Sequence, residues 1–187
     1  MPKIKFKVIN IQSEQLCRSA EDDFFYFDKI NSAYKKLKQA VQLTPEHFKS
    51  TMLLADAAFI KGRLKEALQL YIKASEINSD SARAYAAAAG CFSALNKHAA
   101  AAEYCDKALA LLNCDNYGLL LQVFELKISA LLAVHEYEQA FKTWQSAELK
   151  LRSPLDKFSC KIDYELLNKK SNLQKRLSQS NLKIVQN

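Results

Sequence analysis

The stretch RLKEALQLYIKASEIN, residues 63–78, places two alanines seven residues apart with a tyrosine between them. The same order of a small, a large and a small residue recurs 34 residues later in HAAAAEYCDKALALLN, residues 98–113, and 34 residues earlier in the chain. Residues three and four apart share one face of a helix, and small residues there let two helices approach closely. We therefore expect a series of helices that pack through this face. The three sets are Ala33, Leu37 and Ala40; Ala67, Tyr71 and Ala74; and Ala101, Cys105 and Ala108.

Each alanine-bearing segment follows another amphipathic segment, so the sequence predicts helical hairpins. FKSTMLLADAAFIKG, residues 48–62, precedes the first quoted stretch, and Gly62 stands at the turn between the two. ARAYAAAAGCFSALNK, residues 82–97, precedes the second, with Asn96 at its turn. Asparagine tolerates the left-handed conformation that often ends a helix.

The 34-residue period, the paired alanines, the aromatic Tyr71 between them and a proline at a unit boundary in LTPEH, residues 43–47, resemble the tetratricopeptide repeat (TPR) family. Ser79 and Asn113 replace that proline at the next two boundaries. The resemblance implies an all-α fold, a right-handed superhelix of helix-turn-helix repeats. The expected TPR-like domain covers residues 13–152, with units at about 14–47, 48–81, 82–115 and 121–152.

A fourth unit is predicted from Ala140, Trp144 and Ala147, which repeat the small, large, small face. Its first alanine follows Ala101 by 39 residues, so five residues are inserted relative to the other units. Turn-forming residues gather in NCDNYGLLL, residues 113–121. We expect a longer loop or an extended helix there.

The two ends of the chain differ from the repeats. Residues 1–12 are predicted to form a basic N-terminal extension, and residues 153–187 a capping helix with a basic tail, because a terminal repeat exposes an apolar face unless something covers it. The formal charge of +7 belongs to these ends, since residues 13–154 carry 17 basic and 17 acidic residues. A track of clustered Lys and Arg is what nucleic-acid backbones require, so a nucleic-acid partner is not expected. The alternative is an RNA-associated helical-repeat protein that uses its basic ends.

Catalytic and cofactor chemistry receives little support from the residue pattern. The five cysteines contain no C-x-x-C pair, the glycines form no phosphate-binding loop, and no nucleophile has a recognisable partner base. We expect no enzyme activity, no cofactor and no metal. The absence of a long apolar segment and of a signal peptide predicts a cytoplasmic protein that does not enter the membrane.

The resemblance also implies where a partner binds, because the first helices of TPR hairpins line a concave groove. Steps of three and four residues along the first helices of the second and third units give the groove residues. They are Lys49, Met52, Leu53, Asp56, Ile60, Arg83, Ala86, Ala87 and Gly90. The TPR adaptors that hold a C-terminal carboxylate use Asn, Lys and Arg on this face, whereas Asp22 and Asp56 would repel a carboxylate here. The sequence therefore predicts a protein-interaction module, an adaptor, scaffold or assembly chaperone, that binds a peptide or protein segment with apolar anchors.

Overall fold

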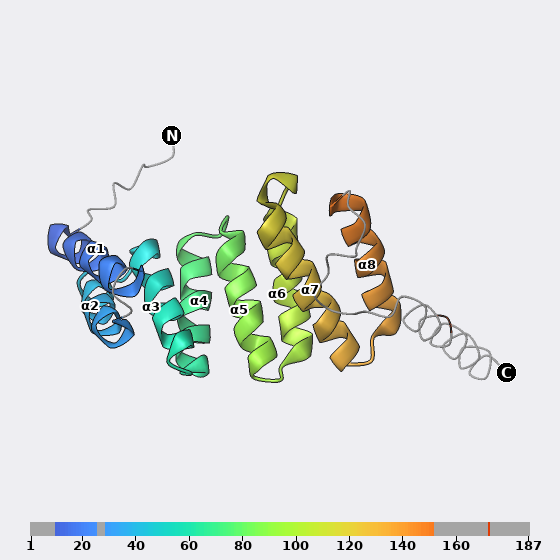
Figure 1. Cartoon of the computed structure of the whole chain (residues 1–187), viewed down its shortest axis with the longest axis horizontal. Helices are drawn as coiled ribbons and strands as arrows, with labels where there is room; N and C mark the ends of the chain where they lie inside the picture. The colour runs from blue at the N-terminus through green and yellow to red at the C-terminus, as the bar shows by residue number, and fades with distance from the viewer. Residues whose placement is uncertain (1–9, 26–28, 152–171, 173–187) are drawn as a thin grey trace. The chain divides into compact units, whose positions relative to one another are not determined.

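The computed structural model describes residues 10–25, 29–151 and 172, and within these ranges the chain is helical (Figure 1). In this described part of the chain, eight α-helices follow one another, with one short 3₁₀ helix among them. Their bounds are α1 Ile11–Phe25, α2 Ile30–Leu43, α3 Phe48–Ile60, α4 Leu64–Ile77, α5 Ala82–Ala94, α6 His98–Leu111, η1 Cys114–Asn116, α7 Tyr117–Ala133 and α8 Tyr137–Leu151. The all-α fold of paired, antiparallel helices is confirmed, and the handedness of the superhelix stays a prediction.

The chain divides into two compact units, Met1–Ala84 and Tyr85–Asn187. In the first unit α1 packs on α2, α2 on α3, and α3 on α4. In the second unit α7 packs between α6 and α8, and Phe92 of α5 lies against Tyr104 of α6 with ring centroids 4.9 Å apart. Within each unit, helices that are neighbours in the chain therefore pack on each other, as the predicted hairpins require.

The predicted small, large, small face is the packed face of every second helix. All eight alanines of the four sets have no exposed surface, and Leu37 and Cys105 are equally buried. Tyr71 is 4% exposed, and only Trp144 of the fourth set is half-buried. The 34-residue register is therefore confirmed, because the small residues that repeat at this period all lie on buried faces of their helices.

Three hairpin turns have one residue each in the same left-handed backbone conformation. Gly62, Asn96 and His135 have φ of 71°, 58° and 62°, the left-handed region in which glycine and asparagine are least strained. In each turn the backbone amide of the next residue donates a hydrogen bond of 2.9 Å to a carbonyl of the preceding helix. The pairs are Arg63 to Ala58, Lys97 to Phe92 and Glu136 to Leu131. These bonds satisfy carbonyls that the helix end leaves without a partner.

The five inserted residues extend a helix rather than a loop. They are taken up by η1 and by α7, which has 17 residues where α3 and α5 have 13. At the other end, α1 begins at Ile11, two residues before the expected start of the repeat domain, and it is a regular helix with Cys17 and Ala20 buried.

Several predictions concern parts of the chain that the structure does not describe. The capping helix and tail, residues 153–187, lie outside the described residues apart from Asn172, and so does the basic extension up to residue 9. The alternative function of RNA binding through the basic ends rests on the same segments. Among the described helices, none is long and apolar enough to cross a membrane.

Candidate functional site

The first unit contains an open cavity of about 250 Å³, which we call the Asp56 cavity. Helix α3 contributes three neighbouring positions to it, because residues 56, 59 and 60 fall on one helix face. Helices α1 and α4 and the first turn of α5 close the other sides. The lining residues are Phe24, Asp56, Phe59, Ile60, Tyr71 and Arg83.

Asp56 is held on two sides. The Tyr71 hydroxyl donates to Oδ1 of Asp56 at 2.6 Å, and the Arg83 guanidinium donates to Oδ2 at 2.8 Å. The carboxylate is 18% exposed and the Arg83 side chain 64%, so the acid is set into the wall and the guanidinium stays in solvent. Charge-assisted hydrogen bonds of this kind fix a side chain in one position. The polar part of the cavity is therefore ordered before any ligand arrives.

The apolar part of the cavity is exposed. Phe59 is 41% and Ile60 57% accessible to solvent, although both end a helix that is otherwise largely buried. They come directly before the turn at Gly62, where α3 leaves the core. Two large apolar side chains beside an ordered carboxylate form a surface that can cover an apolar side chain of a ligand.

The structure brings together three of the nine predicted groove residues, Asp56, Ile60 and Arg83. Met52 and Leu53 are 4% and 6% exposed and belong to the core, so the expectation that their side chains line an open surface is corrected. The reason is that α3 is packed on more than one side, with eight buried residues among its 13.

The remaining predicted residues do not line this cavity. Lys49 pairs with Glu21 of α1 at 2.8 Å, and this hydrogen bond raises the pKa of the lysine above its ordinary value. Ala86, Ala87 and Gly90 are half-buried residues of α5 in the second unit. Their participation in one groove with the residues of α3 stays a prediction.

Sequence reasoning missed three lining residues, Phe24, Phe59 and Tyr71. Phe59 lies three residues after Asp56 on the same helix face, so the helical period was a sufficient signal for it. Tyr71 was assigned to packing alone, yet while its ring is buried its hydroxyl reaches Asp56. Nothing in the local pattern of α1 distinguishes Phe24 from its neighbours.

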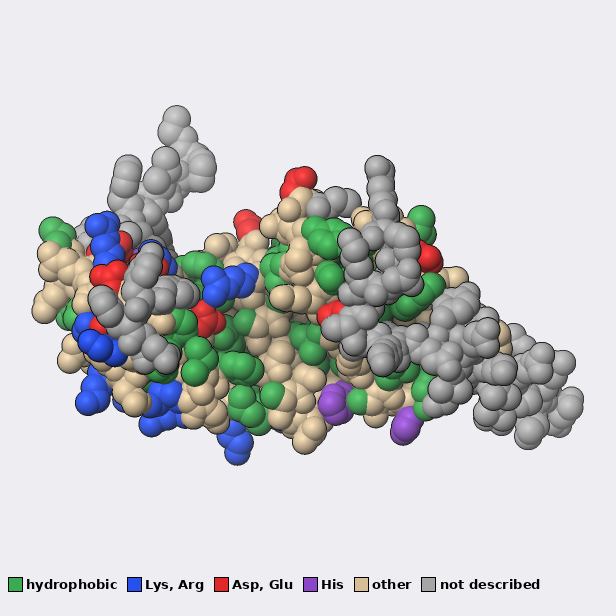
Figure 2. Space-filling view, viewed as in Figure 1, with side chains coloured by type: hydrophobic (Ala, Val, Ile, Leu, Met, Phe, Trp, Pro, Cys, Tyr) green, Lys and Arg blue, Asp and Glu red, His purple; other side chains and the backbone are tan. Residues whose placement is uncertain are grey.

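The charges around the first unit are balanced. Residues 10–84 hold eleven Lys and Arg and ten Asp and Glu. On the face shown in Figure 2, acids lie among the basic side chains in the upper part of this unit, whereas its lower edge shows Lys and Arg without acids between them. Lys36 lies 2.7 Å from Asp23, and the hydrogen bond from this lysine lowers the pKa of the carboxyl below its ordinary range.

Two thiols are buried in the helical core, and burial changes their acidity. Burial raises the pKa of Cys105 to about 12 and also raises the pKa of Cys17. A thiolate is the reactive form of cysteine, so burial disfavours reaction at these two side chains. In the described ranges, His, Cys, Asp and Glu do not gather in a group that could hold a metal ion.

Comparisons with known proteins agree with this architecture. Residues 27–91 match the family model described as tetratricopeptide repeat. No curated protein sequence matches the chain.

Solved structures that resemble the fold include MamA, with a TM-score of 0.68 and 19% identity over 75% of this chain and 78% of that one. The type III secretion chaperone SycD of Yersinia enterocolitica, solved in complex with a peptide of the translocator YopD, has a TM-score of 0.60 and 19% identity over 64% and 92%. The TPR2B domain in the pHsp70 complex of yeast Sti1 has a TM-score of 0.53 and 23% identity over 68% and 97%.

At these identities the likeness concerns the fold. The repeated hairpins with buried alanine pairs, the family match over residues 27–91 and the shared fold together identify the chain as a tetratricopeptide repeat protein.

Proposed function

We propose that this protein is a protein-interaction module that binds a peptide segment of a partner through an apolar side chain placed in the Asp56 cavity. The observation that carries the proposal is the exposure of Phe59 and Ile60 beside a carboxylate already held by Tyr71 and Arg83. The tetratricopeptide repeat is a protein-interaction fold, and the relatives solved with a YopD peptide and with pHsp70 are consistent with a peptide ligand.

Apolar contact supplies the affinity in this proposal. Burying apolar surface is worth roughly 25 cal/mol per Å², so one Leu or Phe of a ligand covered by Phe24, Phe59 and Ile60 contributes about 1.5–3 kcal/mol. Because the cavity is only about 250 Å³, it accepts one such side chain rather than several. Additional contacts along the ligand are needed for micromolar binding.

In this proposal Arg83 fixes the direction in which the peptide lies. Its guanidinium has five donors and is mostly exposed, so donors remain for the carbonyl oxygens of a peptide after one nitrogen has bonded Asp56. Asp56 neutralises the charge of this arginine nearby. We therefore expect recognition of an apolar residue and its backbone rather than of a carboxylate.

A selection from a random peptide library displayed on phage tests the proposal with the full chain as bait. We expect enriched peptides to share one large apolar residue and to lose binding about tenfold or more to Phe59→Glu, which places a charge where the apolar side chain would sit. Leu43→Glu is the matched control, because Leu43 is in the same unit and is 42% exposed against 41% for Phe59. Peptides that bind both variants as well as wild type would reject the Asp56 cavity as the binding site.

A further inference from the structure

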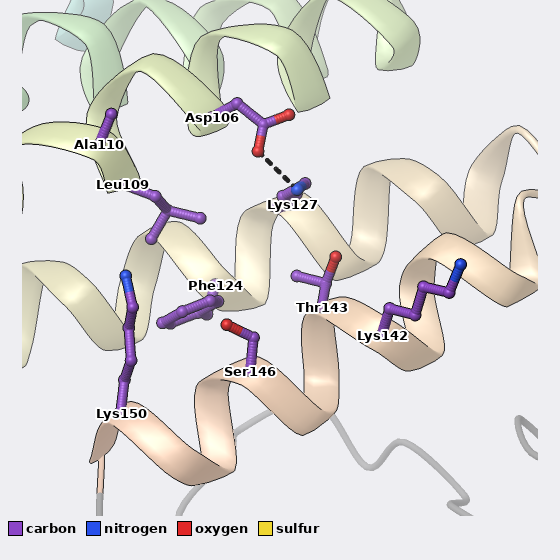
Figure 3. Close-up of a pocket in the computed structure, with 9 residues that line it drawn as sticks. All are labelled: Asp106, Leu109, Ala110, Phe124, Lys127, Lys142, Thr143, Ser146 and Lys150. Atoms are coloured by element: carbon purple, nitrogen blue, oxygen red, sulfur yellow. Dashed lines mark hydrogen bonds and ion pairs between the residues drawn. The ribbon is translucent and has the colours of Figure 1, made fainter.

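The second unit has a larger cavity of about 430 Å³, which we call the lysine cavity (Figure 3). It is bounded by α6, α7 and α8. Its lining residues are Asp106, Leu109, Ala110, Phe124, Lys127, Lys142, Thr143, Ser146 and Lys150. No part of the Asp56 cavity contributes to it, so the inference drawn from it is independent of the proposed function.

The basic residues of this unit are concentrated at the cavity. Residues 85–151 hold five lysines, no arginine and seven acids. Three of the five lysines line the cavity, but only one of the seven acids, Asp106, does so. Within the lining, lysines therefore outnumber acids, although residues 85–151 are acidic by count and Glu138, which pairs with Lys142, lies just outside the lining.

The ion pairs around the cavity leave part of this charge available. Lys127 contacts Asp106 at 2.6 Å, and with 16% of its side chain exposed it is largely committed to that pair. Lys142 contacts Glu138 at 3.0 Å one turn away, but its side chain is 67% exposed. Because this pair is exposed to solvent, an incoming anion can compete for the Lys142 ammonium group.

The centre of the cavity is apolar with a hydroxyl at its edge. Phe124 is 2% exposed and forms the base, and Leu109 faces it from α6. Figure 3 shows the Ser146 hydroxyl pointing toward Phe124, with the ammonium groups of Lys150 and Lys142 at opposite ends of the lining. A ligand with two acids and an apolar group between them matches this order.

The distance between Lys142 and Lys150 determines how far apart two acidic residues of a ligand must be to contact both lysines. Lys142 and Lys150 are eight residues apart on α8, which corresponds to about 12 Å along a helix. An extended peptide rises about 3.3 Å per residue, so side chains four residues apart are separated by about 13 Å and lie on the same side of the chain. The apolar residue midway between them shares that side.

We propose that the lysine cavity binds an extended acidic peptide segment with the pattern Glu-x-Leu-x-Glu or its aspartate equivalent. The acids contact Lys142 and Lys150, and the leucine packs on the exposed part of Leu109. A single-stranded nucleic acid fits less well, because the one aromatic ring of the lining is buried and offers no face for base stacking.

The probe is the heptapeptide Gly-Glu-Ser-Leu-Ser-Glu-Gly with blocked ends, titrated into the ¹⁵N-labelled full chain carrying Phe59→Glu, which removes the Asp56 cavity from the measurement. We expect saturable amide shifts confined to the neighbourhoods of residues 106–110, 124–127 and 142–150. The dissociation constant should rise about tenfold in Lys142→Gln/Lys150→Gln, the equivalent of roughly 0.7 kcal/mol for each lost charge contact.

Two controls are included. One tests whether binding depends on the spacing of the acids in the peptide, and the other tests whether it depends on the overall charge of the protein. Gly-Glu-Glu-Ser-Leu-Ser-Gly, with the same composition and adjacent acids, should bind several-fold more weakly. Lys97→Glu changes the charge of an exposed lysine outside the lining and should leave the dissociation constant within about twofold of its value in the parent chain. A circular-dichroism melt establishes that each variant is folded.

The proposal is overturned by any of three results. These are equal binding of both peptides, equal binding by the Lys142→Gln/Lys150→Gln variant, or a uridine octamer that shifts the same amides at lower concentration than the heptapeptide does. Absence of shifts up to millimolar peptide in the folded chain also overturns it. None of these results bears on peptide selection by the Asp56 cavity.

Discussion

The Tyr71 hydroxyl donates a hydrogen bond of 2.6 Å to Oδ1 of Asp56, which ties α4 to α3 at the wall of the Asp56 cavity. Tyr71 itself is 4% exposed, so this bond is sheltered from water on the tyrosine side. One buried residue thus also positions the polar group of the cavity.

Replacing Tyr71 with Phe removes this hydroxyl and keeps the ring. We expect a loss of unfolding free energy of about 1–2 kcal/mol, because hydrogen bonds to charged groups lie at the upper end of the usual range. Urea unfolding followed by circular dichroism measures it. Tyr117→Phe, at an exposed tyrosine of α7, is the control and should change the midpoint little. Equal effects of the two substitutions would show that the Asp56 bond does not stabilise the fold.

Enlarging the buried alanines tests the repeat register. Ala74 and Ala108 have no exposed surface, so Ala74→Leu and Ala108→Leu should each destabilise by about 1–3 kcal/mol through overpacking. Ala99→Leu on the exposed side of α6 should be nearly neutral. Urea midpoints decide the matter, and unchanged midpoints for both buried sites would contradict the assignment of this face to helix packing.

Replacement by alanine should change the stability of the fold in opposite directions at two glycines. Gly62 has φ of +71°, where a Cβ is strained, so Gly62→Ala should cost about 1–2 kcal/mol. Gly90 lies within α5, and no described atom comes within 4 Å of the Cβ that alanine would add. Gly90→Ala should therefore stabilise by about 0.5–1 kcal/mol through its higher helix propensity. Thermal unfolding of both variants checks the signs, and a stabilising Gly62→Ala would refute the left-handed turn.

Acid should remove the contribution of the Asp23–Lys36 pair. Because the folded-state pKa of Asp23 is lowered, its contribution is complete above the unfolded value of about 3.9 and is lost as the pH falls through the folded value. Asp23→Asn should therefore be less stable than wild type at pH 7, with a difference that shrinks by pH 3. Asp22→Asn, at the exposed neighbour, is the control. A difference that is constant from pH 7 to pH 3 would contradict the pairing.

The repeat register was predictable because close helix packing admits only small residues at two levels of each hairpin, and the sequence repeats them at one period. The turns at Gly62 and Asn96 were predictable because few residues tolerate positive φ. Burial of Met52 and Leu53 was not, since a helical period does not reveal that α3 packs on more than one side.

The candidate site was predictable only in part, for a related reason. The period of α3 placed Asp56 and Ile60 on one face, and Arg83 followed from the next hairpin. The contact of Tyr71 with Asp56 joins residues 15 apart on different helices, and it depends on how those helices turn toward each other. Local patterns hold no information on that rotation.

The most direct test of the central claim is photo-crosslinking of a library-selected peptide to the full chain with benzoylphenylalanine at position 59 or, as the matched control, at position 43. Both positions are about equally exposed in the first unit, so the reagent is equally available at each. Binding in the Asp56 cavity predicts a covalent adduct at position 59, mapped by mass spectrometry to the peptide's apolar residue, and little adduct at position 43. An adduct that forms equally at both positions, or mainly at position 43, would contradict it.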